Sequence, residues 1–164
     1  MPKIRNSKPT LNVTTKKQPT QDSVLFRYSE LNDIPELMKV IDDVEIETKE
    51  KSRNVLLERI GQKQLVTVIL ENKIIGFIGW SKNYNNNNQA WFIEQITIHK
   101  DYRRHGTGLN LINYFLNVCK LEGINVVYAT VQKHNEKSLN MFKKAGGDII
   151  EKSEKENVIR ISIK

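Results

Sequence analysis

The feature of this chain that most constrains its fold is a short basic loop with two glycines, Arg103-Arg104-His105-Gly106-Thr107-Gly108. An apolar run at residues 91–98 precedes the loop, and a helical pattern at residues 109–121 follows it. A strand, a glycine loop and a helix in this order aim the unpaired N–H groups of the first helical turn at one point, where the helix dipole favours an anion. Glycine also adopts the positive φ that such a turn needs. The stretch therefore predicts a site for a phosphate-bearing ligand.

The spacing excludes two common phosphate-binding loops. A Walker loop needs Gly-Lys-Ser/Thr after a first glycine and four further residues, and the chain contains no such string. The dinucleotide pattern G-x-G-x-x-G needs a third glycine at position 111, which is Leu111 here. Other nucleotide-like ligands remain, and coenzyme A is one of them.

The same loop resembles motif A of the GNAT superfamily, a family of acyl-CoA-dependent N-acyltransferases. The family signature is Gln/Arg-x-x-Gly-x-Gly/Ala, and this chain has Ile96-Thr97-Ile98 followed by Arg103-x-x-Gly106-x-Gly108. A second stretch, Asn135-x-x-Ser138 followed by Phe142-x-x-x-Gly146, resembles motif B, Asn-x-x-Ala-x-x-x-Tyr-x-x-x-Gly. One helix and one strand separate the two motifs, as in the family. The resemblance covers residues 24–164.

This resemblance implies an α/β fold of one domain with a mixed, twisted sheet of about six to seven strands and about four helices. The fourth and fifth strands are expected to splay apart around the cofactor. From the sequence pattern we expect strands at residues 23–28, 65–70, 74–80, 91–98, 124–131, 149–152 and 158–163. We expect helices from an N-cap at Asn32 to about residue 44, and at residues 49–60, 109–121 and 135–145.

The resemblance also implies a cofactor-binding set. Its members are Ile96, Thr97, Ile98, Arg103, Arg104, His105, Gly106, Thr107, Gly108, Asn135, Ser138 and Phe142. The backbone of residues 96–98 is expected to pair with the pantetheine amides and to supply an oxyanion donor. Ile96 and Ile98 are equally consistent with core positions, and Asn135 with a helix cap. The expected co-substrate is acetyl-CoA, and no metal is expected.

Glu94 is the candidate general base. In a regular strand Phe92, Glu94, Ile96 and Ile98 share one face. A carboxylate among apolar neighbours is desolvated, which favours its uptake of a proton. The alternative is an exposed glutamate that a bulge in the strand sets free.

Motif B departs from the family at one position. The tyrosine that protonates the departing thiolate in relatives is replaced by Phe142, which has no proton to donate. His134 is the candidate acid, with Tyr128, Ser138 or water as alternatives. A loop histidine such as His134 is also consistent with a plain exposed position.

Charge and composition suggest two regions. Of the net charge of +7, +4 belongs to residues 1–22, which are rich in Lys, Thr and Pro and which we expect to be a disordered basic tail. Residues 23–164 then form the acetyltransferase domain, with +3. Cys119 is the single cysteine and occupies an apolar helix position, so a core role is favoured. With no disulfide framework, no signal segment and no membrane span visible, we expect a cytoplasmic protein.

The predicted function is direct transfer of the acetyl group from acetyl-CoA to a primary amine of a small molecule, peptide or protein. Phe142 suggests an alternative, a non-catalytic acyl-CoA-binding sensor. The pI of about 9.4 suggests another, a nucleic-acid-binding module, but the domain lacks a basic stripe with interleaved aromatic residues. Neither a membrane nor a specific nucleic acid is an expected partner, and the sequence is compatible with a homodimer.

Overall fold

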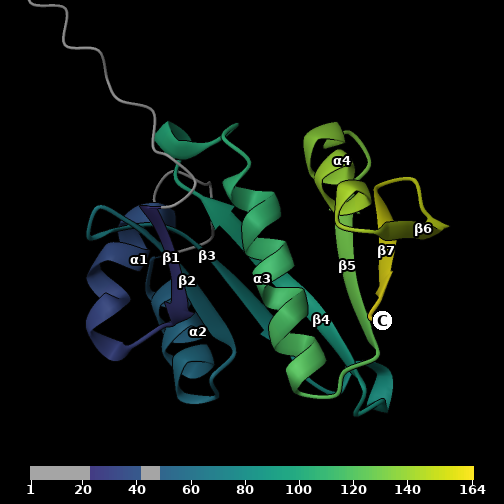
Figure 1. The fold of residues 1–164 in the computed structure, drawn as a ribbon, viewed down its shortest axis with the longest axis horizontal. Coiled ribbons are helices and arrows are strands. Elements are labelled where there is room, and N and C mark those ends of the chain that lie inside the picture. Colours follow the sequence, from purple (N-terminus) through teal and green to yellow (C-terminus); the bar gives the residue numbers. More distant parts are fainter. Residues whose placement is uncertain (1–22, 42–48) are drawn as a thin grey trace, which may run out of the picture.

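One seven-stranded sheet organises the computed structural model, which describes residues 23–41 and 49–164 (Figure 1). The strands are β1 (Val24–Tyr28), β2 (Leu65–Leu70), β3 (Lys73–Ser81), β4 (Ala90–Ile98), β5 (Val126–Gln132), β6 (Gly147–Lys152) and β7 (Glu156–Ser162). The α-helices are α1 (Ile34–Ile41), α2 (Lys49–Gly61), α3 (Thr107–Leu121) and α4 (Glu136–Lys144). Short 3-10 turns are η2 (Leu31–Asp33), η3 (Tyr84–Asn86) and η4 (Lys100–Tyr102). The expected mixed sheet with four helices is confirmed.

The strand order is β1-β2-β3-β4-β5-β7-β6. Neighbouring strands are antiparallel except β4 and β5, which are parallel because α3 connects them. The turn between β2 and β3 has two residues in the left-handed region, Glu71 and Asn72, with φ of 48° and 63°. This is the backbone that a tight hairpin of two right-twisted strands requires.

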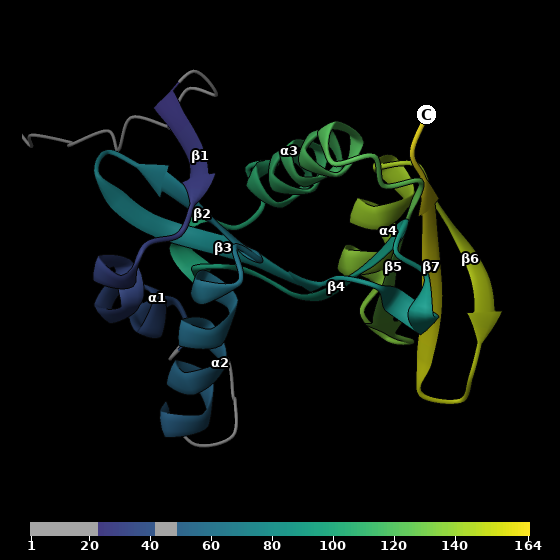
Figure 2. The ribbon, with the colours of Figure 1, turned by 90° about the horizontal axis from the view of Figure 1, so that it is seen from below.

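Two apolar clusters hold the helices on opposite faces of the sheet. α1 and α2 lie on one face of β2–β4, where Leu37, Leu56 and Phe77 are buried (Figure 2). α3 lies on the other face, and its Phe115 packs against Trp80 and Trp91, with ring centroids 4.8 and 6.1 Å away. α3, which follows β4 in the chain, therefore covers the face of the sheet opposite to α1 and α2.

The start of the first helical region differs from the prediction. Asn32 lies exposed within η2 and does not cap a helix; α1 begins at Ile34. The turn is instead closed by Asp33, whose carboxylate accepts the Glu30 N–H at 2.8 Å and the Arg27 guanidinium at 2.7 and 2.8 Å. These hydrogen bonds to the buried carboxylate of Asp33 hold the turn before α1, so the helix start does not need a cap from Asn32. The expected end near residue 44 lies outside the described residues.

The other elements lie close to their expected places. β5 begins at Val126 and not at residue 124, because Gly123 adopts a φ of 73° and ends α3 in a tight turn. In that turn the Ile124 N–H donates to the Cys119 carbonyl at 2.9 Å. The predicted tail at residues 1–22 lies outside the described part of the chain. Among the described helices, none combines the length and apolar character needed to cross a membrane.

Candidate active site

β4 and β5 separate along their length. Their pairing runs from Ala90 opposite Val126 to Ile93 opposite Ala129 and stops there. Both strands continue, β4 to Ile98 and β5 to residue 132, and Figure 1 shows them diverging beside α3. On the side that faces β5, the backbone of residues 94–98 therefore has no strand partner within the described sheet. An extended ligand with amide groups fits such an edge.

Glu94 lies in a β-bulge where this separation begins. Gly79 of β3 is opposite Gln95, while the next residue, Trp80, is opposite Ile93, so Glu94 is the extra residue of β4. Of the two alternatives for Glu94, the structure shows the exposed glutamate in a bulge and not the regular strand. The bulge changes which side chains share a face.

The two halves of β4 show this change of face. Before the bulge, the ring of Phe92 stacks on Tyr84 at 4.9 Å, while its neighbour Trp91 packs toward α3. After the bulge, Ile96 and Ile98 pack against the core on the α3 face. Phe92 thus lies opposite to them, and Glu94 is exposed rather than surrounded by apolar side chains.

The glycine loop closes the end of this opening. Arg103 Nε donates a hydrogen bond to the Ile98 carbonyl at 2.7 Å and ties the loop to the end of β4. Arg104 and Gly106 adopt positive φ, 67° and 77°. Gly106 is the N-cap of α3, and no described side chain caps that helix end. The first N–H groups of α3 are therefore available to an anion.

Gly108 has a packing role that the sequence pattern does not indicate. A Cβ at this position would lie 2.7 Å from the sulfur of Met141 in α4. Its lack of a side chain lets the first turn of α3 approach α4. Thr107 beside it is buried, and His105 is exposed. The two glycines of motif A thus differ: Gly106 supplies backbone conformation, and Gly108 supplies close approach.

Motif B residues are placed on α4 and at its start. The Asn135 side chain accepts a hydrogen bond from the Ser138 N–H at 3.1 Å, so Asn135 caps the helix. Phe142 is 3% exposed and belongs to the core. His134 is exposed in the loop before α4. Tyr128 packs against Tyr84 on the face of β5 away from the core, at 5.0 Å between ring centroids.

Arg59 of α2 is a residue at this site that the sequence pattern did not single out. Its guanidinium lies over Gly79 of β3, since a Cβ there would come within 2.3 Å of Nη1. Burial lowers the pKa of Arg59, and the charges of Glu94 and Glu58 oppose that effect. Arg59 and Glu94 are therefore neighbours on the face of the sheet that α2 covers.

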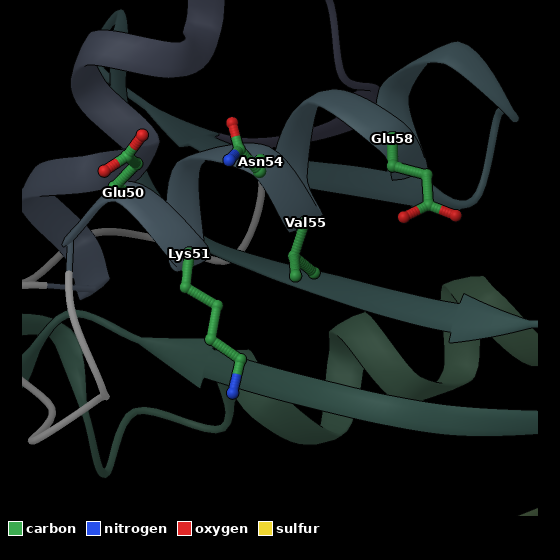
Figure 3. A pocket seen from close by; sticks show the side chains of 5 residues that line it. All are labelled: Glu50, Lys51, Asn54, Val55 and Glu58. Carbon is green, nitrogen blue, oxygen red and sulfur yellow. The ribbon is translucent and has the colours of Figure 1, made fainter.

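An open hollow of about 360 Å³ lies along α2, and Figure 3 shows the side chains that line it. Its lining residues are Glu50, Lys51, Asn54, Val55 and Glu58. Lys51 and Val55 project to the same side of the helix in Figure 3. None of the residues from motifs A and B lines it, so it is separate from the predicted cofactor site.

Neither a reactive cysteine nor a metal-binding cluster is found among the described residues. Cys119 is fully buried, and burial raises its pKa to about 12, so its thiol is unreactive and the expected core role is confirmed. Within residues 23–41 and 49–164, no group of three or more His, Cys, Asp and Glu side chains is arranged to hold a metal ion.

Known sequences resemble this chain over part of its length. N-alpha-acetyltransferase 50 of Danio rerio is 30% identical over 78 residues, which are 47% of this chain and 46% of that protein. GCN5-related N-acetyltransferase 6, chloroplastic, of Arabidopsis thaliana is 28% identical over 71 residues, which are 43% of this chain and 25% of that protein. The matched region thus spans less than half the length of these relatives.

Solved structures share the fold over most of the chain. The PaiA N-acetyltransferase of Thermoplasma acidophilum, in complex with coenzyme A, has a TM-score of 0.73 at 16% identity and covers 85% of this chain and 99% of that one. Ard1 of Thermoplasma volcanium has a TM-score of 0.72 at 19% identity and covers 87% and 99%. The model of the acetyltransferase (GNAT) family matches residues 31–147. With the family model spanning most of the described domain, this chain belongs to the acetyltransferase (GNAT) family.

Proposed function

We propose that this protein transfers the acetyl group of acetyl-CoA to a primary amine by direct attack. The observation that carries the proposal is the opening between β4 and β5, which begins at Ile93 and ends at the uncapped start of α3. An unpaired strand edge and an anion-binding helix end on one continuous segment suit a ligand with a peptide-like arm and phosphates. Coenzyme A has both.

The phosphate end of the coenzyme would lie at the glycine loop. Gly106 presents its backbone without a Cβ, and a Cβ there would meet no atom within 4 Å beyond its own turn of chain. The exposed side chains of Arg104 and His105 stand in the same loop. Arg103 has a different role, because its Nε already bonds to the Ile98 carbonyl. We therefore assign Arg103 to holding the loop and Arg104 to the phosphates.

The backbone of residues 96–98 would bind the pantetheine amides and donate one N–H to the oxyanion of the tetrahedral intermediate. One such donor is typically worth about 2.7–4 kcal/mol of barrier. This assignment uses main-chain groups, so Ile96 and Ile98 also serve as packing residues on the α3 face. The two roles are compatible.

Glu94 would act as the general base at the start of the opening. The amine nitrogen, once deprotonated, attacks the thioester carbon, and the C–N bond forms. The C–S bond then breaks, the coenzyme leaves as thiolate, and the nitrogen releases its remaining extra proton to water, which leaves a neutral amide. Glu94 is exposed, so it takes the proton from the ammonium directly or through a water molecule. The bulge that exposes Glu94 thus supports access to solvent rather than a desolvated carboxylate.

Protonation of the thiolate has no dedicated tyrosine. Phe142 is buried and has no proton to give. His134 is exposed in the loop before α4. The Asn135 side chain is engaged in the helix cap, where it accepts a hydrogen bond from the backbone N–H of Ser138. We propose that water or His134 supplies this proton.

The acceptor is proposed to be an amine of a small molecule, peptide or protein. The name N-alpha-acetyltransferase 50 makes peptide N-termini one class to test. The acceptor would approach from the α2 face, because Glu94 lies beside Arg59 there. A cytoplasmic location, independence from metal ions and a homodimer are further proposals that concern the whole protein.

An amine panel tests the proposal. Full-length protein is mixed with acetyl-CoA and with amino acids, short peptides, polyamines and aminosugars, and mass spectrometry detects acetylated products. Calorimetric titration with acetyl-CoA runs in parallel. Binding together with transfer supports the enzyme; binding without transfer to any amine supports the acyl-CoA sensor; no binding contradicts both.

A further inference from the structure

The guanidinium of Arg59 lies against the backbone of β3 at Gly79. A Cβ at Gly79 would lie 2.3 Å from Nη1 and 3.2 Å from Cδ of Arg59. Because Gly79 has no side chain, the guanidinium rests against the backbone of β3. A side chain at position 79 would fill the space that the guanidinium occupies.

The structure gives the guanidinium of Arg59 no partner among the described residues. Within the described part of the chain, Arg59 makes no side-chain hydrogen bond or ion pair, and its Nη1 is buried. Buried donors without a partner are rare in native structures, since each has lost its bonds to water without replacement. Burial also lowers the pKa of Arg59, which is the sign of a cation held partly out of water. An anion from outside the protein would satisfy this group.

The position of Arg59 relative to the opening defines where that anion would lie. Gly79, under the guanidinium, is opposite Gln95, the residue after the bulged Glu94. The pairing of β4 with β5 stops one residue before Glu94, at Ile93. Gly79, on which the guanidinium rests, therefore lies one strand spacing, roughly 5 Å, from β4 at the start of the opening. A cation and a carboxylate stand side by side there without forming an ion pair with each other.

A molecule with an ammonium and a carboxylate a few bonds apart complements this arrangement. The ammonium would meet Glu94, which the proposed reaction needs, and the carboxylate would meet the planar fork of Arg59. We propose that Arg59 binds a carboxylate of the acceptor, an inference that rests on the proposed acetyl transfer. The preferred acceptor is then an amino-acid-like amine whose acid group is close to the amine.

The test compares acceptors that differ in this one group. Free amino acids are paired with their carboxamides, which keep the amine and the carbonyl oxygen and lose the negative charge. The wild-type enzyme should favour the acids by about 10- to 100-fold in kcat/KM, the usual worth of a charged hydrogen bond. Arg59→Gln should remove this preference by raising the KM for the acids. Arg53→Gln, an exposed change on the same helix, should keep it.

Two measurements separate ligand binding from a structural role. Arg59→Gln should not lower the melting temperature, because it removes a half-buried cation that no described residue pairs with. Gly79→Ala should displace the guanidinium without removing its charge, and so also lose the preference for acids. A lower melting temperature for Arg59→Gln, with equal losses on acids and carboxamides, would show a structural residue.

The results also distinguish this inference from the function on which it rests. Equal kcat/KM for acids and carboxamides in the wild type would overturn the role of Arg59 and leave acetyl transfer intact. Acetyl-CoA binding without transfer to any amine would overturn the acetyl transfer, and the inference with it.

Discussion

The two faces of the sheet at the β4–β5 opening are encoded differently. On the α3 face, the proposed coenzyme side is built from a continuous segment, residues 96–108, with α4 packed beside it. On the α2 face, the proposed acceptor side is built from single residues of three elements, Arg59, Gly79 and Glu94. A local motif is sufficient to predict the arrangement on the α3 face, because one loop supplies its backbone conformation. The arrangement on the α2 face forms only after long-range packing has brought the elements together.

The largest expected effect is on the acceptor side. Glu94→Gln keeps the size of the side chain and removes the base, and loss of a general base costs about 10²- to 10⁴-fold in rate. The loss should shrink at high pH, where the amine is already neutral, while acetyl-CoA affinity stays the same. A pH–rate profile with any acetylated amine measures this, with Glu122→Gln at the far end of α3 as the control. Normal kcat/KM at neutral pH for Glu94→Gln would remove Glu94 from the mechanism.

On the proposed coenzyme side, two glycines with similar positive φ provide a matched pair. Gly106 and Gly123 have φ of 77° and 73°, and a Cβ at either would meet nothing within 4 Å. Valine at either position should cost about 1–3 kcal/mol of strain. Gly106→Val should also weaken acetyl-CoA binding by about 10- to 100-fold, if backbone N–H groups there hold phosphates. Equal affinity of the two variants in calorimetric titration would place the phosphates elsewhere.

A smaller effect concerns the support of α1. Burial raises the pKa of Asp33, but hydrogen bonds from Arg27 and the Glu30 N–H outweigh it and hold the pKa below its ordinary value. The stabilisation is therefore present above the unfolded pKa of about 4 and is lost as the pH falls through the folded pKa. Asp33→Asn should lower the free energy of unfolding by about 1–2 kcal/mol at pH 7, a figure discounted for the partly exposed Arg27.

Denaturant unfolding at pH 7 and at pH 3 or below checks this. The difference in free energy of unfolding between the wild type and Asp33→Asn should become smaller in acid. A gap that is the same at both pH values would mean that the Asp33 charge does not contribute. The predicted narrowing refers to stability, and coenzyme binding is not expected to depend on Asp33.

The smallest expected effect restores the family residue at motif B. Phe142→Tyr should leave kcat unchanged or raise it modestly, because water or His134 already serves as acid in the proposed mechanism. Phe142 is 3% exposed, so the new hydroxyl needs a partner or costs about 1–3 kcal/mol of stability. Rates and melting temperatures measured together show which applies. A large gain in kcat would mean that protonation of the thiolate limits the natural enzyme.

Much of the fold was predictable because its signals are local. The turn at Glu71 and Asn72, the apolar runs on both sides of it, and the glycine that ends α3 each depend on a few adjacent residues. Motif A also fixed the place of Gly106 at the start of α3. These features follow from backbone conformation and side-chain periodicity, which a sequence displays directly.

The remaining features depend on contacts between distant elements. The bulge at Glu94 arises from the register between β3 and β4, and no residue near Glu94 signals it. The role of Gly108 depends on Met141, and the place of Arg59 depends on Gly79, each far away in the chain. Phe142 and Asn135 matched their motif positions, but only the packing shows one in the core and the other as a helix cap.

Backbone hydrogen exchange with and without acetyl-CoA tests the central claim most directly. If the coenzyme lies in the β4–β5 opening, amides among residues 94–98 and at the start of α3, residues 106–109, should exchange more slowly when acetyl-CoA is bound. The first turn of α2, on the other face of the sheet, should be unaffected. Protection along α2 with unchanged exchange at residues 94–98 and 106–109 would contradict the account.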